Sequence, residues 1–190
     1  MDDEYKVEYA RFGTVCDIEK GTQFNKESMN KIGSYPVING GITPSGFIEK
    51  YNRESNTITI SQGGASAGFV NWMNVKFWAG AHCYTVKPSS KVLNRFVYFF
   101  LKSQELKLQE SQYGAGIPTL SKQDIEMLNI PIPHIKVQEE IVKILDGFYT
   151  YSTDLTIGLP AEIEKRKQQY EYYRDTLLNF SNKAAIQESL

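Results

Sequence analysis

Short segments in which apolar and polar residues alternate fill the first two-thirds of this 190-residue chain. Residues 56–61, NTITIS, alternate in the way that is typical of a half-buried strand. Four more short segments bounded by Gly, Asn or Pro predict strands as well, and these are YPVING, GFVNWM, VKFWAG and HCYTVKP. Residues 93–109 have mostly helical apolar spacing and predict the clearest helix of this part.

A capped helix and an edge strand are predicted next. Ser121 can cap a helix, with Asp124 three residues further on at the positive end of that helix. The following EMLNIPIP predicts an edge strand, because its prolines cannot donate hydrogen bonds to a neighbouring strand. Residues 1–135 are therefore interpreted as one mixed α+β domain that is rich in strands.

The pattern changes at about residue 136, where apolar residues recur in alternating steps of four and three. Two such phases are separated at Gly158–Pro160, and Pro160 can begin a helix but cannot continue one without a kink. We expect two helical segments in line, with residues 136–182 forming a coiled-coil region and residues 183–190 a tail. The alternative is a helix that packs back on its own domain. The expected seam residues are Ile141, Ile144, Phe148, Ile163, Tyr170, Tyr173 and Leu177.

Composition and charge narrow the function classes. The N-terminal residues lack the apolar segment of a signal peptide, and no apolar run is long enough to span a membrane, which predicts a cytoplasmic protein. Cys16 and Cys83 form neither a disulfide framework nor a metal pattern. Residues 20–100 contain nine basic and three acidic residues, a net charge of +6, although the whole chain has a charge of −1. This asymmetry suggests a basic face, and ordinary surface charge is the alternative.

Signatures of catalysis are absent from the sequence. There is no P-loop, no dinucleotide-binding glycine motif and no nucleophile elbow. His82 and Cys83 are neighbours in a predicted strand, so their side chains point to opposite faces, and a core cysteine beside a partly exposed histidine is the simpler interpretation. The sequence therefore favours binding over catalysis.

Three polar, glycine-rich loops supply candidate binding residues, at 39–46, 61–68 and 112–122. Glycine lets the backbone approach a ligand, and neighbouring amide and hydroxyl groups can pair with base edges. From this loop chemistry we predict a group of base readers: Asn39, Gln62, Ser66, Tyr113 and Thr119. We predict a second group that contacts phosphates: Lys20, Lys26, Lys31, Lys76 and Lys122.

Longer motifs give the chain a family resemblance. They are GSYPVINGG, TITISQGGASAGFV, GAGIPTLSKQDIEMLNIPIPHIKVQEEIVKILD and GLPAEIEKRKQQYEYYRDTLL. With these motifs the chain resembles half of the specificity subunit of a type I restriction–modification system, from about Tyr9 to Phe180. The usual subunit has two target-recognition domains and two conserved helical regions, whereas this chain has one of each. It is thus either a half-length subunit or one half of a longer one.

The resemblance implies a DNA-reading subunit without catalytic groups or cofactors of its own. Its partners would be double-stranded DNA, a modification subunit that binds S-adenosylmethionine and methylates adenine, and an ATP-using restriction subunit. A homodimer through antiparallel helices would give a palindromic site. Two other hypotheses stay open: a helical adaptor whose mixed domain binds a protein, and a stand-alone enzyme, which lacks a titratable cluster.

Overall fold

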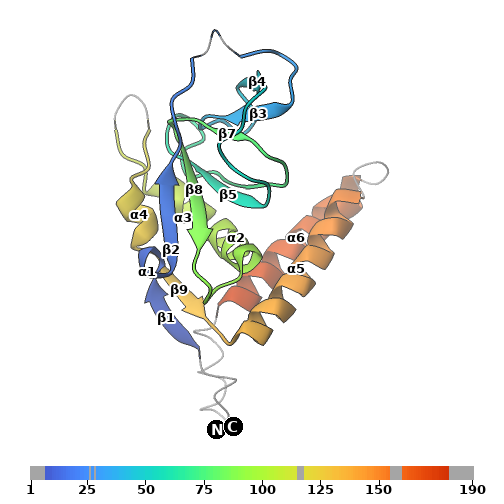
Figure 1. The fold of residues 1–190 in the computed structure, drawn as a ribbon. Helices are drawn as coiled ribbons and strands as arrows, with labels where there is room; N and C mark the ends of the chain where they lie inside the picture. The colour runs from blue at the N-terminus through green and yellow to red at the C-terminus, as the bar shows by residue number, and fades with distance from the viewer. Residues whose placement is uncertain (1–6, 26, 28, 115–117, 155–159, 180–190) are drawn as a thin grey trace, which may run out of the picture.

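The computed structural model describes residues 7–179 apart from 26, 28, 115–117 and 155–159. A four-stranded antiparallel sheet forms its centre (Figure 1). The strands follow one another in space as β2 (Cys16–Lys20), β8 (Cys83–Pro88), β5 (Thr57–Ser61) and β6 (Val70–Met73). The predicted strand at NTITIS is therefore confirmed as β5, but as an inner strand of this sheet it is buried on both faces and not half-buried.

The two faces of the central sheet are covered differently. Tyr84 and Val86 of β8 belong to the large core cluster, which includes the buried residues of the helices. Cys83 belongs to a smaller cluster that also holds Ile38 and Phe77. A second sheet supplies part of this smaller cluster, and its strands are β4 (Gly46–Ile48), β3 (Tyr35–Ile38) and β7 (Trp78–Ala79). The result is three layers: small sheet, central sheet and helices.

The predicted edge strand and capped helix are both confirmed. Strand β9 (Asn129–Ile132) pairs with β1 (Glu8–Arg11) in a separate two-stranded sheet. Helix α4 (Lys122–Glu126) begins with a capping box, in which the Asp124 amide donates to the Ser121 hydroxyl at 3.0 Å and the Asp124 carboxylate accepts from the Ser121 amide at 3.3 Å. A short helix, α1 (Phe12–Val15), connects β1 to β2.

The single helix predicted over residues 93–109 is wrong, because a turn at Gln104 divides it into α2 (Asn94–Ser103) and α3 (Glu105–Glu110). The break allows an ion pair across it to serve the edge strand β6. Lys102 and Glu105 lie 2.6 Å apart. The Val70 amide donates to Glu105 at 2.8 Å, and the Val70 carbonyl accepts from Lys102 at 3.0 Å. This ion pair, called the β6 cap below, takes the place of a neighbouring strand at Val70.

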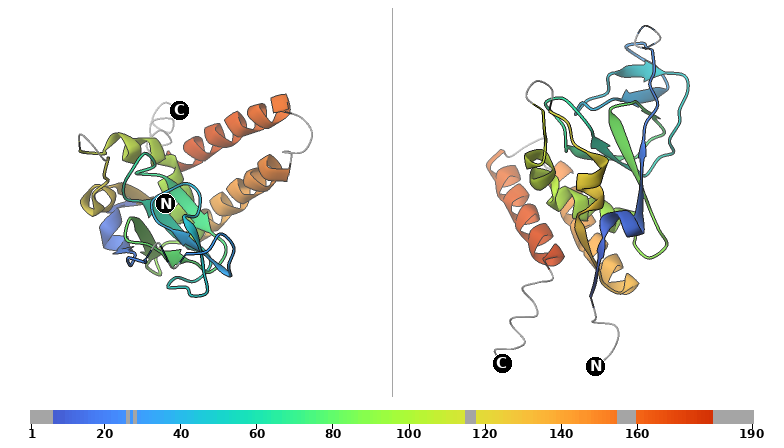
Figure 2. Two further views of the ribbon diagram at one scale, coloured as in Figure 1. Left: turned by 90° about the horizontal axis from the view of Figure 1, so that it is seen from above. Right: turned by 90° about the vertical axis from the view of Figure 1, so that its left-hand side faces the viewer.

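The expectation of two helical segments in line is also wrong. Helix α5 (Ile135–Asp154) and helix α6 (Pro160–Leu178) lie side by side as a hairpin (Figure 2). The rings of Phe148 and Tyr173 stack between them with centroids 5.2 Å apart. Helix α6 returns to α2, and Leu178 is buried in the large core cluster. Pro160 does begin a helix, as predicted.

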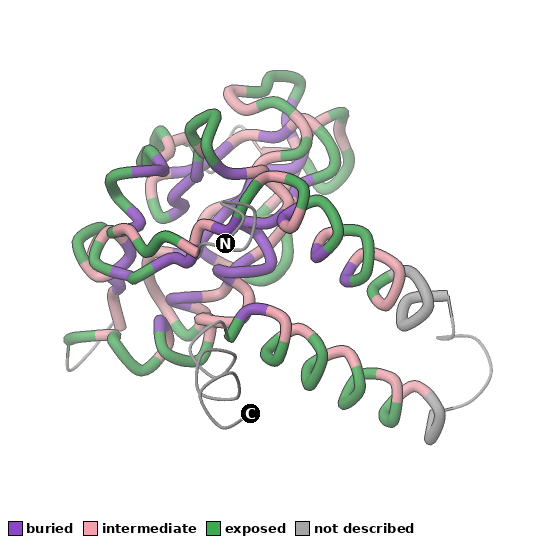
Figure 3. Tube along the Cα trace, turned by 90° about the horizontal axis from the view of Figure 1, so that it is seen from below, coloured by how far each residue is buried: buried purple, intermediate pink, exposed green. Residues whose placement is uncertain are grey.

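Packing of the hairpin on its own domain explains the difference. Among the described seam residues, Ile141 is buried in the large core, and Tyr170 and Leu177 pack against it. Figure 3 shows buried positions where the helices meet the domain and exposed positions along their outer turns. Heptad spacing predicts an apolar stripe on a helix that must pack against another surface. Here the mixed domain of the same chain provides part of that surface. The predicted boundary at residue 135 stays a prediction, since the core draws on both sides of it.

We predict that Leu145→Ala lowers the free energy of unfolding of the whole chain by about 2–5 kcal/mol, because Leu145 is fully buried in the large core. The neighbouring Ile144 is 41% exposed, so Ile144→Ala is the matched control, with an expected loss below about 1 kcal/mol. Urea unfolding followed by circular dichroism measures both. Equal losses would show that α5 is not part of the domain's core.

Candidate nucleic-acid interface

The backbone of His82 joins the first two glycine loops. Its amide donates to the Asn39 side-chain oxygen at 3.1 Å, and its carbonyl accepts from the Gln62 amide at 2.9 Å. His82 lies directly before β8, so the two loops meet at the end of the central strand. Gly80 comes so close to the Asn39 side chain that a Cβ at that position would collide with it. The loops at residues 39–46 and 61–68 therefore lie next to each other.

The third loop joins the same cluster by backbone hydrogen bonds. The Gly64 amide donates to the Pro118 carbonyl at 2.9 Å, and the Leu120 amide donates to the Gln62 carbonyl at 2.8 Å. Within the loop, Tyr113 and Thr119 exchange backbone hydrogen bonds at 3.0 and 3.1 Å. Hydrogen bonds therefore join the described residues of all three glycine loops, which are far apart in the sequence, and we call these residues the loop cluster.

The side chain of Gln112 and a glycine fix the middle loop against α3. The Gln112 amide group donates to the Ala67 carbonyl at 2.6 Å. Gly68 has a positive φ of 86°, and a Cβ there would lie 2.8 Å from the Gln109 nitrogen, so both backbone conformation and space favour glycine. The loop cluster is thus tied to the helical layer and does not hang free from the sheet.

Four comparisons place this architecture among known proteins. Residues 4–165 match the family model of the type I restriction modification DNA specificity domain. The chain belongs to this family. The putative type I specificity subunit S.MpnORF285P of Mycoplasma pneumoniae is 35% identical over 172 residues, which cover 87% of this chain and 56% of that protein. The type I restriction enzyme MpnII specificity subunit of the same organism is 32% identical over 171 residues, covering 87% of this chain and 51% of that protein.

A solved structure agrees with these sequence matches. The crystal structure of the S subunit of a type I restriction–modification system from M. genitalium superposes with a TM-score of 0.74 at 26% identity. It covers 82% of this chain and 42% of that chain. The specificity domain described here thus spans about half the length of the curated relatives it matches.

The predicted base readers all belong to the loop cluster, but their side chains differ in exposure and in hydrogen bonding. Tyr113 is 58% exposed. The Asn39 side-chain oxygen is occupied by the His82 amide. The Gln62 side-chain oxygen is buried and has no hydrogen-bond partner among the residues that the structure describes. Ser66 and Thr119 are half-buried. Their role in reading bases stays a prediction.

The predicted phosphate lysines are more dispersed. Lys20 ends β2, and both it and Lys31 are exposed. Lys122 is half-exposed and pairs with Glu126 at 3.2 Å. Lys76 donates to the Tyr51 hydroxyl at 3.0 Å and lies 3.1 Å from a Glu54 oxygen. The hydrogen bond to Tyr51, and to a smaller extent the one to Glu54, raises the pKa of Lys76. Lys26 lies outside the described residues.

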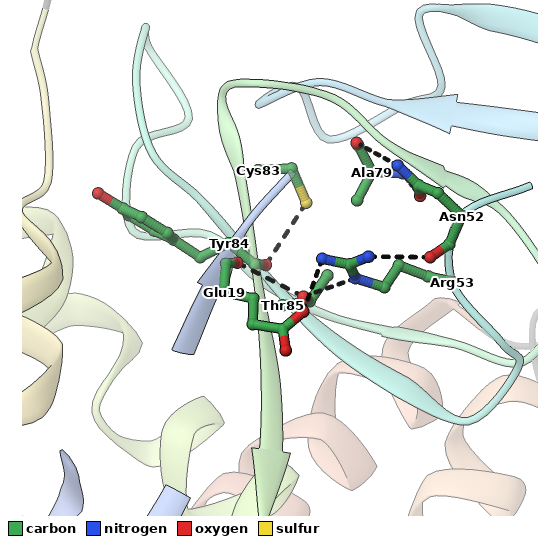
Figure 4. A network of polar contacts seen from close by, with 7 residues as sticks. All are labelled: Glu19, Asn52, Arg53, Ala79, Cys83, Tyr84 and Thr85. Atoms are coloured by element: carbon green, nitrogen blue, oxygen red, sulfur yellow. Dashed lines mark hydrogen bonds and ion pairs between the residues drawn. The ribbon is translucent and has the colours of Figure 1, made fainter. Parts of the chain in front are cut away.

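Arg53 belongs to the basic segment of the sequence, but its side chain is engaged in contacts within the fold (Figure 4). Its guanidinium donates to the Thr85 hydroxyl at 3.0 Å and to the Glu19 carboxylate at 2.9 Å. The adjacent Asn52 side chain exchanges two hydrogen bonds with the backbone of Ala79, at 2.7 and 3.1 Å. Arg53 and Asn52 therefore join the central sheet to the small sheet. The charge of Arg53 is balanced inside the fold, which reduces the basic face suggested by the sequence.

The histidine and cysteine neighbours have the arrangement predicted for them. Cys83 is 1% exposed, whereas His82 is exposed. Burial raises the pKa of both Cys83 and Cys16 to about 12, which keeps these thiols protonated and unreactive near neutral pH. In the part of the chain that the structure describes, no three His, Cys, Asp or Glu side chains gather to hold a metal. No helix described there is long and apolar enough to cross a membrane.

Sequence reasoning missed the structural role of His82 and Gly80. Both act through backbone contacts with Asn39, which is more than forty positions away for each, and a single sequence carries no signal for such a contact. A Gly-Ala-His tripeptide directly before a strand is an ordinary turn. Neither Asn52 nor Arg53 had a recognisable signal.

We predict that Gly80→Ala disorders the loop cluster, because its methyl group displaces the Asn39 side chain from the His82 amide. The expected loss is about 1–3 kcal/mol of unfolding free energy, with faster hydrogen exchange at the Gln62 amide. Gly63→Ala is the matched control: its Cβ meets no atom nearer than 3.6 Å, so little change is expected. Exchange mass spectrometry distinguishes the two variants, and identical protection would contradict the role given to Gly80.

Proposed function

We propose that this chain is a sequence-specific DNA-binding subunit of a type I restriction–modification complex that reads one half of a bipartite site. The observation that carries the proposal is the convergence of three glycine loops on the end of β8, in a chain of the specificity-domain family. Among the predicted readers, Tyr113 is exposed and suits base-edge contacts, and the exposed Lys20 and Lys31 suit phosphates. DNA as the partner places the chain in the cytoplasm.

The proposal assigns no reaction to this chain. A modification subunit would bind S-adenosylmethionine and methylate adenine, and a restriction subunit would use ATP, with both directed by the site that this chain reads. One relative in the comparison, the MpnII specificity subunit, is named as part of such an enzyme. Sequencing the methylome of cells with and without this chain, beside its methyltransferase, tests the proposal. An unchanged set of methylated motifs would contradict it.

We predict different consequences for the two groups of DNA contacts. Tyr113→Ala, which removes a predicted base reader, should cost about 1–3 kcal/mol of binding and relax one position of the site. Lys31→Ala should weaken binding to all DNA sequences alike and reduce the salt dependence of the binding constant by about one counterion. Lys143→Ala, on an exposed turn of α5, is the control. Titrations of variant sites at several salt concentrations measure this. Identical profiles for Tyr113→Ala and Lys31→Ala would contradict the division.

A homodimer through the helical region is the second part of the proposal. Large apolar side chains stay exposed on both helices of the hairpin: Ile144 (41%), Tyr149 (42%), Tyr172 (67%) and Tyr173 (38%). A twofold pairing of two hairpins would cover them. Because Ile141, Tyr170 and Leu177 face their own domain, the interface uses the other predicted seam residues together with Tyr172.

We predict that light scattering on the isolated chain gives about twice 21.7 kDa, and that Tyr172→Glu shifts this mass toward the monomer. Lys167→Glu is the control, since it is a larger charge change about 140° away around α6. When this is the only specificity chain, two identical domains should give a palindromic methylation motif. A monomer at micromolar concentration, or an asymmetric motif, would overturn the dimer.

A further inference from the structure

We propose that Gln138 and the Arg95–Asp146 ion pair form a two-point clamp that fixes the direction in which α5 leaves the recognition domain. Resting on the proposed function, the clamp sets the distance between the two DNA half-sites that a complex can read. Arg95 and Asp146 are positioning residues in this proposal and do not contact DNA.

The first point of the clamp is Gln138, a polar side chain with no exposed surface near the start of α5. Its oxygen accepts from the Leu93 amide at 2.9 Å. Its nitrogen donates to the Pro133 carbonyl at 2.9 Å and to the Lys91 carbonyl at 3.2 Å. These bonds join α5 to the chain just before α2 and just after β9. Because buried hydrogen bonds are directional and costly to leave unmade, they fix α5 in rotation and height at this residue.

The second point is Arg95, in the first turn of α2. Its guanidinium holds one Asp146 oxygen with two nitrogens, at 2.6 and 2.8 Å. Four aromatic rings surround the guanidinium carbon, with centroids at 4.7 Å (Trp72), 4.7 Å (Tyr98), 4.8 Å (Phe99) and 5.6 Å (Tyr149). A planar guanidinium between rings has little freedom to turn, so the position of Asp146 is defined closely.

The two points act together because they are separated along one helix. Gln138 and Asp146 are eight residues apart, about 12 Å along the axis of α5. Both attach to the beginning of α2, through Leu93 and Arg95. Ile141 and Leu145, buried between them, hold the helix on the domain, but apolar contact is not directional. Helix α6 also returns to the domain, where Leu178 is buried, but this contact too is apolar, so the two polar points are the directional part of the attachment.

A small change in the direction of the α5 axis displaces the far end of the helix by as much as one base-pair step of DNA. From Gln138 to Asp154 at the end of α5 is about 24 Å. A swing of about 10° moves that end by roughly 4 Å, which exceeds the rise of about 3.4 Å per base pair. If loss of the second clamp point allows a swing of that size, the complex can admit a spacer one base pair longer or shorter.

Distances between two spin labels test the clamp in the full chain. Lys50→Cys in the recognition domain and Glu164→Cys on α6 are both at exposed positions. The buried native thiols, with pKa values raised to about 12, stay unlabelled. Labelled chains are diluted with an excess of unlabelled chains, so that only distances within one chain contribute. Wild type should then give one narrow distance peak, and Asp146→Asn should lose it. Asp146→Glu should restore it. Glu140→Gln is the matched control, because it makes the same chemical change in an exposed ion pair of the same helix.

Thermal melting separates orientation from stability. If Asp146→Asn unfolds, Arg95→Lys keeps the charge but loses the contact through two nitrogens, and the peak should again broaden. A narrow peak in folded Asp146→Asn and Arg95→Lys overturns the clamp.

The DNA consequence is measured separately, with the modification partner and a substrate library that varies the spacer. Wild type and Glu140→Gln should methylate one spacer length, and Asp146→Asn should also accept its neighbours without changing the half-site sequence. A broadened peak with an unchanged spacer overturns the assigned role in spacing. If wild type methylates no site while Asp146→Asn still loses its narrow peak, the proposed function fails and the clamp itself stands.

Discussion

Burial of strand β8 on both faces is the constraint from which the remaining structure follows. Its alternate side chains enter two different cores: Tyr84 and Val86 pack against the helices, and Cys83 packs against the small sheet. A strand placed in this way needs a cover on each side, which produces the three layers. The position of β8 also determines where the glycine loops meet, because the backbone of His82, directly before β8, hydrogen-bonds to Asn39 of the first loop and to Gln62 of the second.

The helical region is best understood as part of this packing. Leu145 and Leu178, one from each helix of the hairpin, are buried in the same cluster as Phe96 of α2. The mixed domain and its helices therefore share one core, as the proposed spacing of two half-sites would require. Tyr172 and Tyr173 remain exposed on α6, which is the surface that the proposed dimer would use.

Local features of the fold could be predicted from the sequence, and non-local ones could not. The alternation of NTITIS, Pro131 of β9 and the Ser121 capping box are properties of neighbouring residues, and all three predicted elements are confirmed, although β5 is buried on both faces. The helix hairpin was missed because heptad spacing shows that a stripe must be covered but not which surface covers it. The turn at Gln104 was missed because the apolar spacing continues through it, and only the β6 cap explains its place. For the candidate site, residue types selected the three loops, whereas their convergence depends on contacts between distant residues.

The β6 cap has a consequence for the life of the chain before it assembles. An open sheet edge offers unpaired backbone groups to any extended segment nearby, including a copy that is still being synthesised. Lys102 and Glu105 already satisfy both backbone groups of Val70, so another strand must break this ion pair and its two hydrogen bonds before it can pair there. The β6 cap thereby hinders strand pairing at Val70 during the time when partner surfaces are still uncovered.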